Sequence, residues 1–213
     1  MNDWDLQLFW SINRDWTSPV LDWLMPALSA IDAWLPLLGL LLVLIAWRGG
    51  RRERTMLLCV AVAIVLSDAV IGNSLKKVFN RVRPRDQMSA VIIRDLAPAR
   101  PRLLALFKAP VSKLSKVTKV PDRGNSLPSN HTLNLFAAAT VIALFFRGWG
   151  LPMYVLACAV AYSRVYVGAH WPSDLVPSAA LGILTGIGAV ALVQRIAAAI
   201  VARRGAASAN AGA

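Results

Sequence analysis

The chain has 213 residues, of which 57% are hydrophobic and 16% are charged, and its formal net charge is +12. A mean hydropathy of +0.55 is compatible with one large soluble core or with a bundle of membrane spans. Segment lengths decide between the two, because a span needs about 20 mostly apolar residues and a buried soluble helix usually keeps a polar face. The long apolar segments of this chain exclude a soluble globular protein.

The first 30 residues contain short apolar pieces broken by Pro19 and Pro26. They lack the basic start and the small-residue cleavage site of a signal peptide. Because proline interrupts helices, we expect two brief helices that lie along the membrane interface or dip into it. The range 1–30 is therefore predicted to be an N-terminal interfacial region.

Five apolar segments follow, each long enough or nearly long enough to cross a bilayer. We predict an all-α fold, a polytopic membrane helical bundle with five clear spans within residues 31–195. The spans are Ile31 to Trp47, Met56 to about Ser74, Thr132 to Phe146, Leu151 to Val167, and Leu175 to Val193. Cys59 and Cys158 both lie inside these spans and indicate neither a disulfide nor a metal site.

The connections between the spans alternate between two sides of the membrane. One side holds the compact basic loop 47–54 and the tail 196–213, which is basic and then, we expect, disordered. The other side holds residues 1–30 and the basic connection 85–127. In this connection lysines alternate with apolar residues, which favours a segment attracted to anionic lipid heads; a solvated basic loop is the alternative.

Two cations mark the end of the second span. Lys76 and Arg83 are seven residues apart, so on one helix they would differ by about 20° in direction and about 10 Å in height. Pro84 would end that helix. Alone, such a pair is typical of cations at a membrane interface.

The stretch SLPSNHTLN, residues 126–134, predicts a helix start that binds an anion. Pro128 suits the first helical turn, and Ser129, Asn130 and His131 would offer free backbone N–H groups with a hydroxyl and an imidazole. Helix N-termini bind anions because these donors are unpaired and the dipole end is positive. A phosphate group is the expected ligand.

The stretch SRVYVGAHWPSD, residues 163–174, brings four chemically active side chains together at the mouth of the last two spans. Ser163 and Arg164 end the fourth span, His170 lies in the turn, and Asp174 opens the fifth. A carboxylate four residues on can bind one imidazole nitrogen and leave the other as a nucleophile or base.

The pieces KKVFNRVRP, PSNH and SRVYVGAHWPSD resemble the signature of the type 2 phosphatidic acid phosphatase family, KxxxxxxRP, PSGH and SRxxxxxHxxxD. Asn130 stands where the commonest form has glycine, and the connection 85–127 has no counterpart in the signature. The resemblance implies a six-helix membrane phosphatase core. The matching residues are Lys76, Arg83, Pro84, Pro128, Ser129, His131, Ser163, Arg164, His170 and Asp174.

The resemblance also implies roles for these residues. His170 would attack phosphorus and form a phosphohistidine, Asp174 would hold its ring, and His131 would protonate the leaving oxygen. No Asp/Glu cluster suited to magnesium is apparent, so we expect a metal-independent enzyme without a cofactor, because fixed donors can replace a metal in phosphoryl transfer. The predicted phosphate-binding groups are Lys76, Arg83, Ser129, Asn130 and Arg164.

Three further residues are predicted to support the site. Asp68 lies within the second span, where a carboxylate must find a partner or stay neutral. Asn134 and Arg164 are its possible partners, and an ordinary hydrogen bond between helices explains Asp68 as well as a catalytic role does. Ser163 is the third supporting candidate.

The predicted function is a membrane lipid phosphatase that acts on a polyprenyl diphosphate, with undecaprenyl diphosphate as the favoured example, or on a phospholipid-type phosphate monoester. Lipid A phosphatase, phosphatidylglycerol phosphate phosphatase and a lipid phosphotransferase are alternatives with the same site. A noncatalytic lipid-binding membrane protein is a different class, against which the set of His131, His170 and Asp174 argues.

The expected partners are the anionic lipid phosphate substrate and the bilayer, without nucleic acid, and the sequence leaves the oligomeric state open. A plain count of Lys and Arg would place the site in the cytoplasm. The compact loop 47–54 favours the reverse, because long connections count less than short ones. With the family resemblance, this predicts a bacterial-type plasma (inner) membrane protein whose site is extracytoplasmic.

Overall fold

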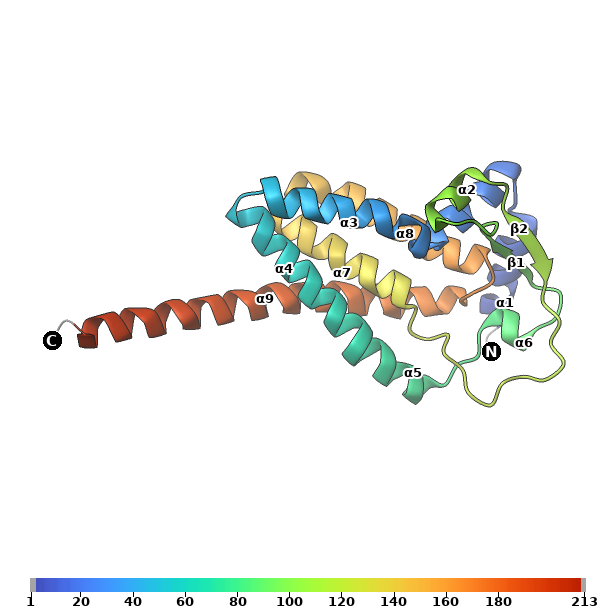
Figure 1. Cartoon of the computed structure of the whole chain (residues 1–213). Coiled ribbons are helices and arrows are strands. Elements are labelled where there is room, and N and C mark those ends of the chain that lie inside the picture. The colour runs from blue at the N-terminus through green and yellow to red at the C-terminus, as the bar shows by residue number, and fades with distance from the viewer. Residues whose placement is uncertain (1–2, 212–213) are drawn as a thin grey trace.

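The computed structural model describes residues 3–211, and it describes the side chains of residues 3–69 and 71–203. Helices dominate, and the long ones run alongside one another as a bundle (Figure 1). The prediction of an all-α membrane-type bundle is confirmed. The bundle contains α3 (Ile31–Arg48), α4 (Arg51–Val65) with its continuation through η2 (Leu66–Gly72) and α5 (Asn73–Phe79), α7 (Asn130–Phe145), α8 (Arg147–Tyr166) and α9 (Pro172–Ala211).

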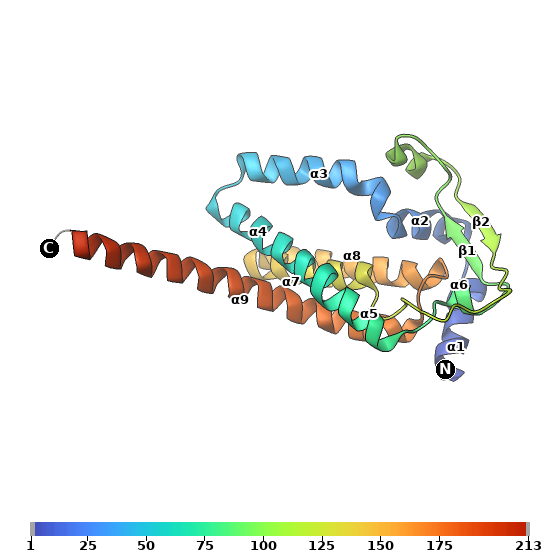
Figure 2. The same cartoon turned by 60° about the horizontal axis from the view of Figure 1, so that its bottom comes forward.

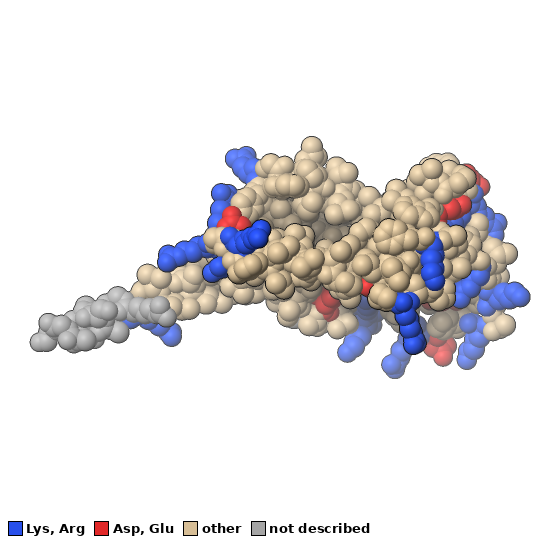
Figure 3. All heavy atoms as spheres, turned by 45° about the horizontal axis from the view of Figure 1, so that its top comes forward, with Lys and Arg blue, Asp and Glu red and all other residues tan. Residues whose placement is uncertain are grey.

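Three described helical stretches are long and apolar enough to cross a membrane: Ile31–Arg48, Arg51–Gln87 and Pro172–Arg203. The apolar helix α7 is shorter, so the number of five spans remains a prediction. Large apolar side chains of α3 are exposed along its length, which is the surface that lipid chains require. Lys and Arg gather toward the two ends of the molecule, with a largely uncharged band between them (Figure 3).

The centre of the bundle is formed where α4, α7 and α9 meet. Small side chains, including Ala63, Ala137 and Ala189, are fully buried there. The contact between α7 and α9 is especially close: a Cβ atom added at Gly182 would lie 2.4 Å from the carbonyl oxygen of Leu133. Membrane helices use small residues in this way, because close approach of their backbones increases van der Waals contact.

The shorter elements cover the end of the bundle that lies away from the free end of α9 (Figure 2). The strands β1 and β2 pair antiparallel, with Ile92 opposite Leu114. These elements are α1 (Asp3–Trp10), η1 (Ser11–Asp15), α2 (Pro19–Ser29), α6 (Pro84–Gln87), β1 (Ile92–Asp95), η3 (Arg102–Phe107) and β2 (Val111–Leu114).

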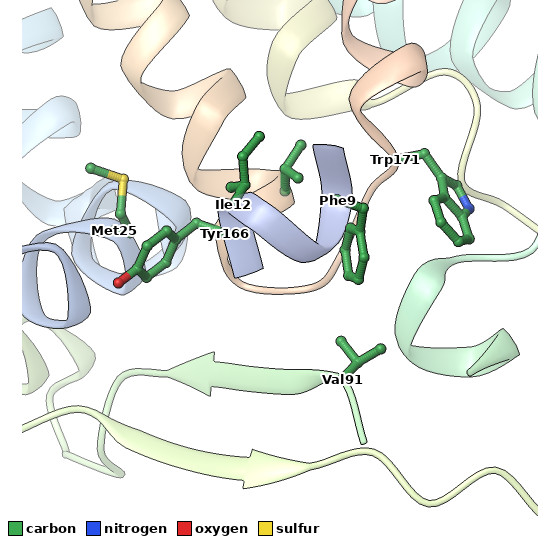
Figure 4. Packing of buried hydrophobic residues seen from close by; sticks show 7 residues of the cluster. Phe9, Ile12, Met25, Val91, Tyr166 and Trp171 are labelled. Carbon is green, nitrogen blue, oxygen red and sulfur yellow. The ribbon is translucent and has the colours of Figure 1, made fainter. Parts of the chain in front are cut away.

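One hydrophobic cluster joins the N-terminal segment to the turn between α8 and α9 (Figure 4). Phe9 of α1 packs against Trp171 with ring centroids 5.3 Å apart, and Tyr166 and Val91 belong to the same cluster. Residues 3–29 are therefore packed against the turn that carries His170. Their location at the membrane interface remains a prediction.

The structure differs from the sequence prediction in several local features. Pro26 lies inside α2 instead of breaking it. The connection 85–127 contains a short β-hairpin that was not predicted. The tail predicted to be disordered continues α9 as far as Ala211, because its alanine-rich sequence has high helix propensity; residues 212–213 lie outside the described residues.

Candidate active site

His170 lies in the turn between α8 and α9, as predicted, and Asp174 lies in the first turn of α9. The backbone N–H of His170 donates to the carbonyl oxygen of Arg164 at 3.1 Å. Gly168 has a φ of +77°, a conformation that favours glycine. The turn therefore holds His170 close to the end of α8.

The Nδ1 atom of His170 has a different partner from the one that was predicted. It lies 2.7 Å from the carbonyl oxygen of Ser126 and 3.6 Å from Oδ2 of Asp174. The shorter contact is the hydrogen bond, because 3.6 Å is too long for one. A proton on Nδ1 donated to this carbonyl leaves the lone pair on Nε2, so the predicted free imidazole nitrogen is retained.

Asp174 is fully buried and accepts hydrogen bonds from three segments. Its partners are the hydroxyl of Ser126, the backbone N–H of Trp171 at 3.0 Å and the guanidinium of Arg81 at 2.5 Å. Because a buried carboxylate must be paired, these donors keep Asp174 ionised next to the His170 ring.

Burial, together with the charges of Arg164 and Arg83, lowers the pKa of His170 to about 4, against the opposing effect of Asp174. The His170 side chain is only 3% exposed. It is therefore neutral at physiological pH, which is the state required of a nucleophile or a base.

The predicted cations converge on the two histidines. Lys76, Arg83 and Arg164 all lie close enough to His131 for their charges to act on its ring. The Nε atoms of Arg83 and Arg164 are buried and have no hydrogen-bond partner among the described side chains and backbone. Buried, unpaired guanidinium donors beside two histidines form a site suited to an anion.

The path of the chain from Lys76 to Arg83 is not the predicted one. Helix α5 ends at Phe79, and Asn80 adopts the left-handed conformation. Arg83 lies outside the helix, and Pro84 begins α6 instead of ending α5. The side chains still meet because residues 80–83 turn back toward the site, where the carbonyl of Val82 accepts from Nε1 of Trp171 at 2.9 Å.

Ser129 is the N-cap of α7, so Pro128 precedes the helix instead of occupying its first turn. The backbone N–H of Ser129 is not free, because it donates to the Ser178 hydroxyl at 2.8 Å. The N–H groups of Asn130 and His131 are in the first turn, where no intrahelical acceptor exists. These two groups, with the His131 ring, remain as predicted anion donors.

Asn130, which departs from the glycine of the signature, uses its side chain to bind Asp68. The Asn130 amide donates to Oδ1 of Asp68 at 2.7 Å, and the Asn134 amide donates to Oδ2 at 3.1 Å. Asp68 lies in the π-helical segment η2. Asn134 is thus the partner of Asp68, whereas Nη1 of Arg164 binds the hydroxyl and carbonyl of Ser29.

Ser163 is fully buried and donates to the carbonyl of Val160 at 2.7 Å, so it binds its own helix. Sequence reasoning missed Ser126, Arg81 and Asp5, which complete the surroundings of Asp174. Ser126 and Arg81 stand within the quoted motifs, but no spacing distinguishes them from neighbouring polar residues.

The family model described as the PAP2 superfamily matches residues 55–198. The chain belongs to this superfamily. This membership confirms the resemblance drawn from the three motifs.

Curated relatives extend the comparison. The chain is 25% identical over 193 residues to a lipid A 4'-phosphatase of Bacteroides thetaiotaomicron. This match covers 85% of this chain and 73% of the relative. It is 26% identical over 153 residues to an undecaprenyl-diphosphatase of Sulfolobus acidocaldarius, covering 70% of this chain and 58% of the relative. A third curated relative matches this chain over 80 residues, which is only 39% of the relative's own length.

The crystal structure of Aquifex aeolicus LpxE resembles the fold of this PAP2 protein. The TM-score is 0.62 at 24% identity, and the match covers 89% of this chain and 96% of that chain. At this identity the likeness supports the fold and carries no statement about substrate.

Proposed function

We propose that this PAP2 protein is a membrane lipid phosphatase that transfers a terminal phosphoryl group to His170 and then to water. The observation that carries the proposal is the pair of buried, unpaired guanidinium Nε atoms of Arg83 and Arg164 beside His131 and His170. A phosphoryl group would satisfy these donors, and the neutral His170 would be next to it.

In the proposed reaction, Nε2 of His170 attacks phosphorus while the bond between phosphorus and the leaving oxygen breaks. His131, protonated when the phosphate anion is bound beside it, gives its proton to that oxygen. His131 then takes a proton from water, the water oxygen attacks phosphorus, and the phosphorus–nitrogen bond breaks to release inorganic phosphate. Lys76, Arg83, Arg164 and the N–H groups of α7 stabilise the charge on the phosphoryl oxygens.

The relatives support a lipid as the carrier of the phosphate. Their names include an undecaprenyl-diphosphatase and a lipid A 4'-phosphatase. We propose a polyprenyl diphosphate such as undecaprenyl diphosphate, or a phospholipid-type monoester, as the first substrate class. The positive side chains supply the charge that a metal would supply elsewhere, so we expect turnover in the presence of a chelator.

A polar cavity favours lipid A-type substrates as a second candidate. The cavity, of about 230 Å³, lies between α2, β1, η3 and the end of α8. It adjoins the phosphate site through Arg164 and would accept a hydroxylated headgroup better than a hydrocarbon chain. Its charged lining residues are Asp32, Arg85, Arg94, Asp95, Arg102 and Arg164.

Phosphate release by the purified protein tests the proposal. We expect release from a lipid phosphate in EDTA, competitive inhibition by vanadate, and loss of both turnover and the phosphoenzyme in His170→Gln. Near-normal turnover by His170→Gln, or activity that EDTA abolishes and magnesium restores, would refute this mechanism.

A lipid panel then separates the two substrate classes. Arg85 lines the cavity and its only ion pair among the described side chains is to Asp86 at 4.0 Å. If the cavity binds a sugar headgroup, Arg85→Gln should raise KM for lipid A more than for undecaprenyl diphosphate. An equal rise for both would assign Arg85 to the shared phosphate site.

A further inference from the structure

Arg81 joins two buried carboxylates at the back of the candidate site. Its Nη1 lies 2.5 Å from Oδ1 of Asp174 and its Nη2 lies 2.5 Å from Oδ2 of Asp5. Both carboxylates are almost completely buried, at 0% and 1% exposure, whereas the Arg81 side chain is 27% exposed. One guanidinium therefore compensates two buried negative charges.

Asp5 is held in this position by the start of α9. The backbone N–H of Ser173 donates to Oδ1 of Asp5 at 2.9 Å, and the Ser173 hydroxyl donates to Oδ2 at 2.7 Å. The same hydroxyl accepts from Nη1 of Arg81 at 2.7 Å. Asp5 and Asp174 thus each bind one Nη atom of the Arg81 guanidinium. Asp5 lies outside the segment 55–198 that the family model matches.

Arg81 also fixes Ser126, whose carbonyl oxygen accepts the hydrogen bond of His170 Nδ1. The carbonyl oxygen of Arg81 accepts from the backbone N–H of Ser126 at 2.8 Å. The Ser126 hydroxyl binds Asp174, and its carbonyl lies 2.7 Å from Nδ1 of His170. Both acceptors next to the imidazole are therefore positioned by the same residue.

We propose that Arg81 and Asp5 are positioning residues that hold Asp174 and Ser126 against His170 and set how much of the Asp174 charge His170 experiences. The inference rests on the proposed role of His170 as nucleophile. It assigns the N-terminal helix α1 a direct part in the site: Asp5 draws part of the Arg81 charge away from Asp174, and Asp174 in turn favours the protonated form of His170.

The signs of the two effects are opposite. Without Arg81, Asp174 is uncompensated and the pKa of His170 rises. Without Asp5, Arg81 compensates Asp174 more fully and that pKa falls. The other charged or titratable groups near His170, which all variants share, are Arg164 of α8, His131 of α7 and Arg83 of segment 80–83.

Selective ¹⁵N-histidine labelling makes the test direct, because the chain has two histidines. In the purified, detergent-solubilised full chain, the ¹⁵N shifts of His170 report its tautomer and its titration, with His131→Gln providing the assignment. We expect Arg81→Gln to raise the pKa of His170 by about one pH unit, because Asp174, whose Oδ2 lies 3.6 Å from Nδ1 of His170, would lose the positive charge that compensates it. Adding Asp5→Asn to Arg81→Gln should bring the pKa part of the way down again.

Kinetics give an independent readout. Arg81→Gln should lower kcat by about tenfold to a hundredfold, the effect of losing a charge-assisted hydrogen bond. KM should change little, because Lys76, Arg83 and Arg164 still bind the phosphate. Arg81→Lys keeps the positive charge but cannot bind both carboxylates through two Nη atoms. The pKa of His170 in Arg81→Lys should therefore be closer to the wild-type value than it is in Arg81→Gln.

Exposed charges provide matched controls. Asp3→Asn, on the same helix as Asp5, and Arg147→Gln, at the far end of the bundle, should leave the titration and kcat unchanged. If His170 titrates alike in wild type, Arg81→Gln and Arg81→Gln with Asp5→Asn, the inference is wrong.

Two further outcomes separate the possibilities. If Arg81→Gln does not fold, Arg81→Lys and Asp5→Asn decide, and wild-type titration and kcat in both would overturn the inference. Normal turnover by His170→Gln would instead overturn the proposed function. If His170→Gln abolishes turnover but the Arg81 variants keep wild-type kcat and His170 titration, this inference alone is overturned.

Discussion

His170 couples the stability of the site to pH. Its pKa is about 4 in the folded protein, mainly because of burial, against about 6.5 in an unfolded chain. Between these values the unfolded chain binds the proton and the folded protein does not, so the free energy of unfolding falls as pH falls. The contribution lost at pH 5 is about 2 kcal/mol.

Thermal unfolding in detergent at pH 7 and pH 5 checks this prediction. His170→Gln cannot take up that proton, so its melting temperature should fall less on acidification than that of the wild type. An identical fall in both proteins would mean that His170 is not buried in a neutral form.

Asn130 offers a second test at the level of one side chain. Asn130→Gly restores the glycine of the family signature but removes the amide that binds Asp68. We expect a loss of about 0.6–2 kcal/mol in the free energy of unfolding, typical of a hydrogen bond between membrane helices. The double variant Asn130→Gly with Asp68→Ala should lose less free energy of unfolding than the sum of the losses in the two single variants. Additive losses would contradict the pairing of Asn130 with Asp68.

The motifs predicted side chains that the structure brings together, because each motif lies near a helix end on one side of the bundle. They could not predict Asp5, whose contact with Arg81 spans 76 residues. Nor could they predict that the carbonyl of Ser126 is the partner of His170 Nδ1, because any residue type supplies a backbone carbonyl. The four-residue spacing between His170 and Asp174 therefore suggested a hydrogen bond to the carboxylate, where the structure has one to the carbonyl of Ser126.

At the scale of elements, the contact of α7 with α9 depends on glycines at a spacing of four. A Cβ atom at Gly182 would lie 2.4 Å from the Leu133 carbonyl oxygen, and one at Gly186 would lie 2.7 Å from that of Ala137. Gly182→Ala should therefore lower the free energy of unfolding by about 1–3 kcal/mol, as overpacking does, and separate Ser129 from Ser178.

Gly188 is the matched control, because nothing lies within 4 Å of an added Cβ atom there. Gly188→Ala should be neutral or stabilise α9 by up to about 1 kcal/mol, the helix propensity difference. Thermal unfolding of both variants measures the contrast, and equal behaviour would argue against close packing at Gly182.

The connection 85–127 carries its lysines on the surface. Lys108, Lys113, Lys116 and Lys119 are all exposed, as they would be either in a segment that attracts anionic lipids or in a solvated basic loop. Replacing the four with Gln should raise KM for a lipid substrate and leave turnover of a small soluble phosphate ester nearly unchanged, because each basic residue contributes about 1 kcal/mol of surface attraction.

Salt should imitate this four-fold variant for the lipid substrate, since it screens surface charge. Equal loss of activity on both substrates would instead show that the segment forms part of the site.

The apolar runs predicted the long helices well, whereas the β-hairpin escaped prediction because strands of four residues lack a periodic signal distinct from a loop.

At the scale of the whole molecule, the two ends of the bundle carry distinguishable labelling positions. Strand β2 and the start of α4 lie at opposite ends of the bundle (Figure 1). Ser112 on β2 and Arg51, the first residue of α4, are both exposed. With Cys59 and Cys158 replaced by Ala, an extracytoplasmic site predicts that Ser112→Cys reacts with a membrane-impermeant maleimide in intact cells. Arg51→Cys should react only after lysis, and the reverse pattern would place the site in the cytoplasm.

The position of Asp174 on the last helix has a consequence for biosynthesis. A ribosome releases Asp5, Arg81, Ser126 and His131 well before it releases α9, so a nascent chain that ends at α8 lacks both His170 and Asp174. If these two residues have the roles proposed above, phosphoryl transfer must await synthesis and insertion of the start of α9.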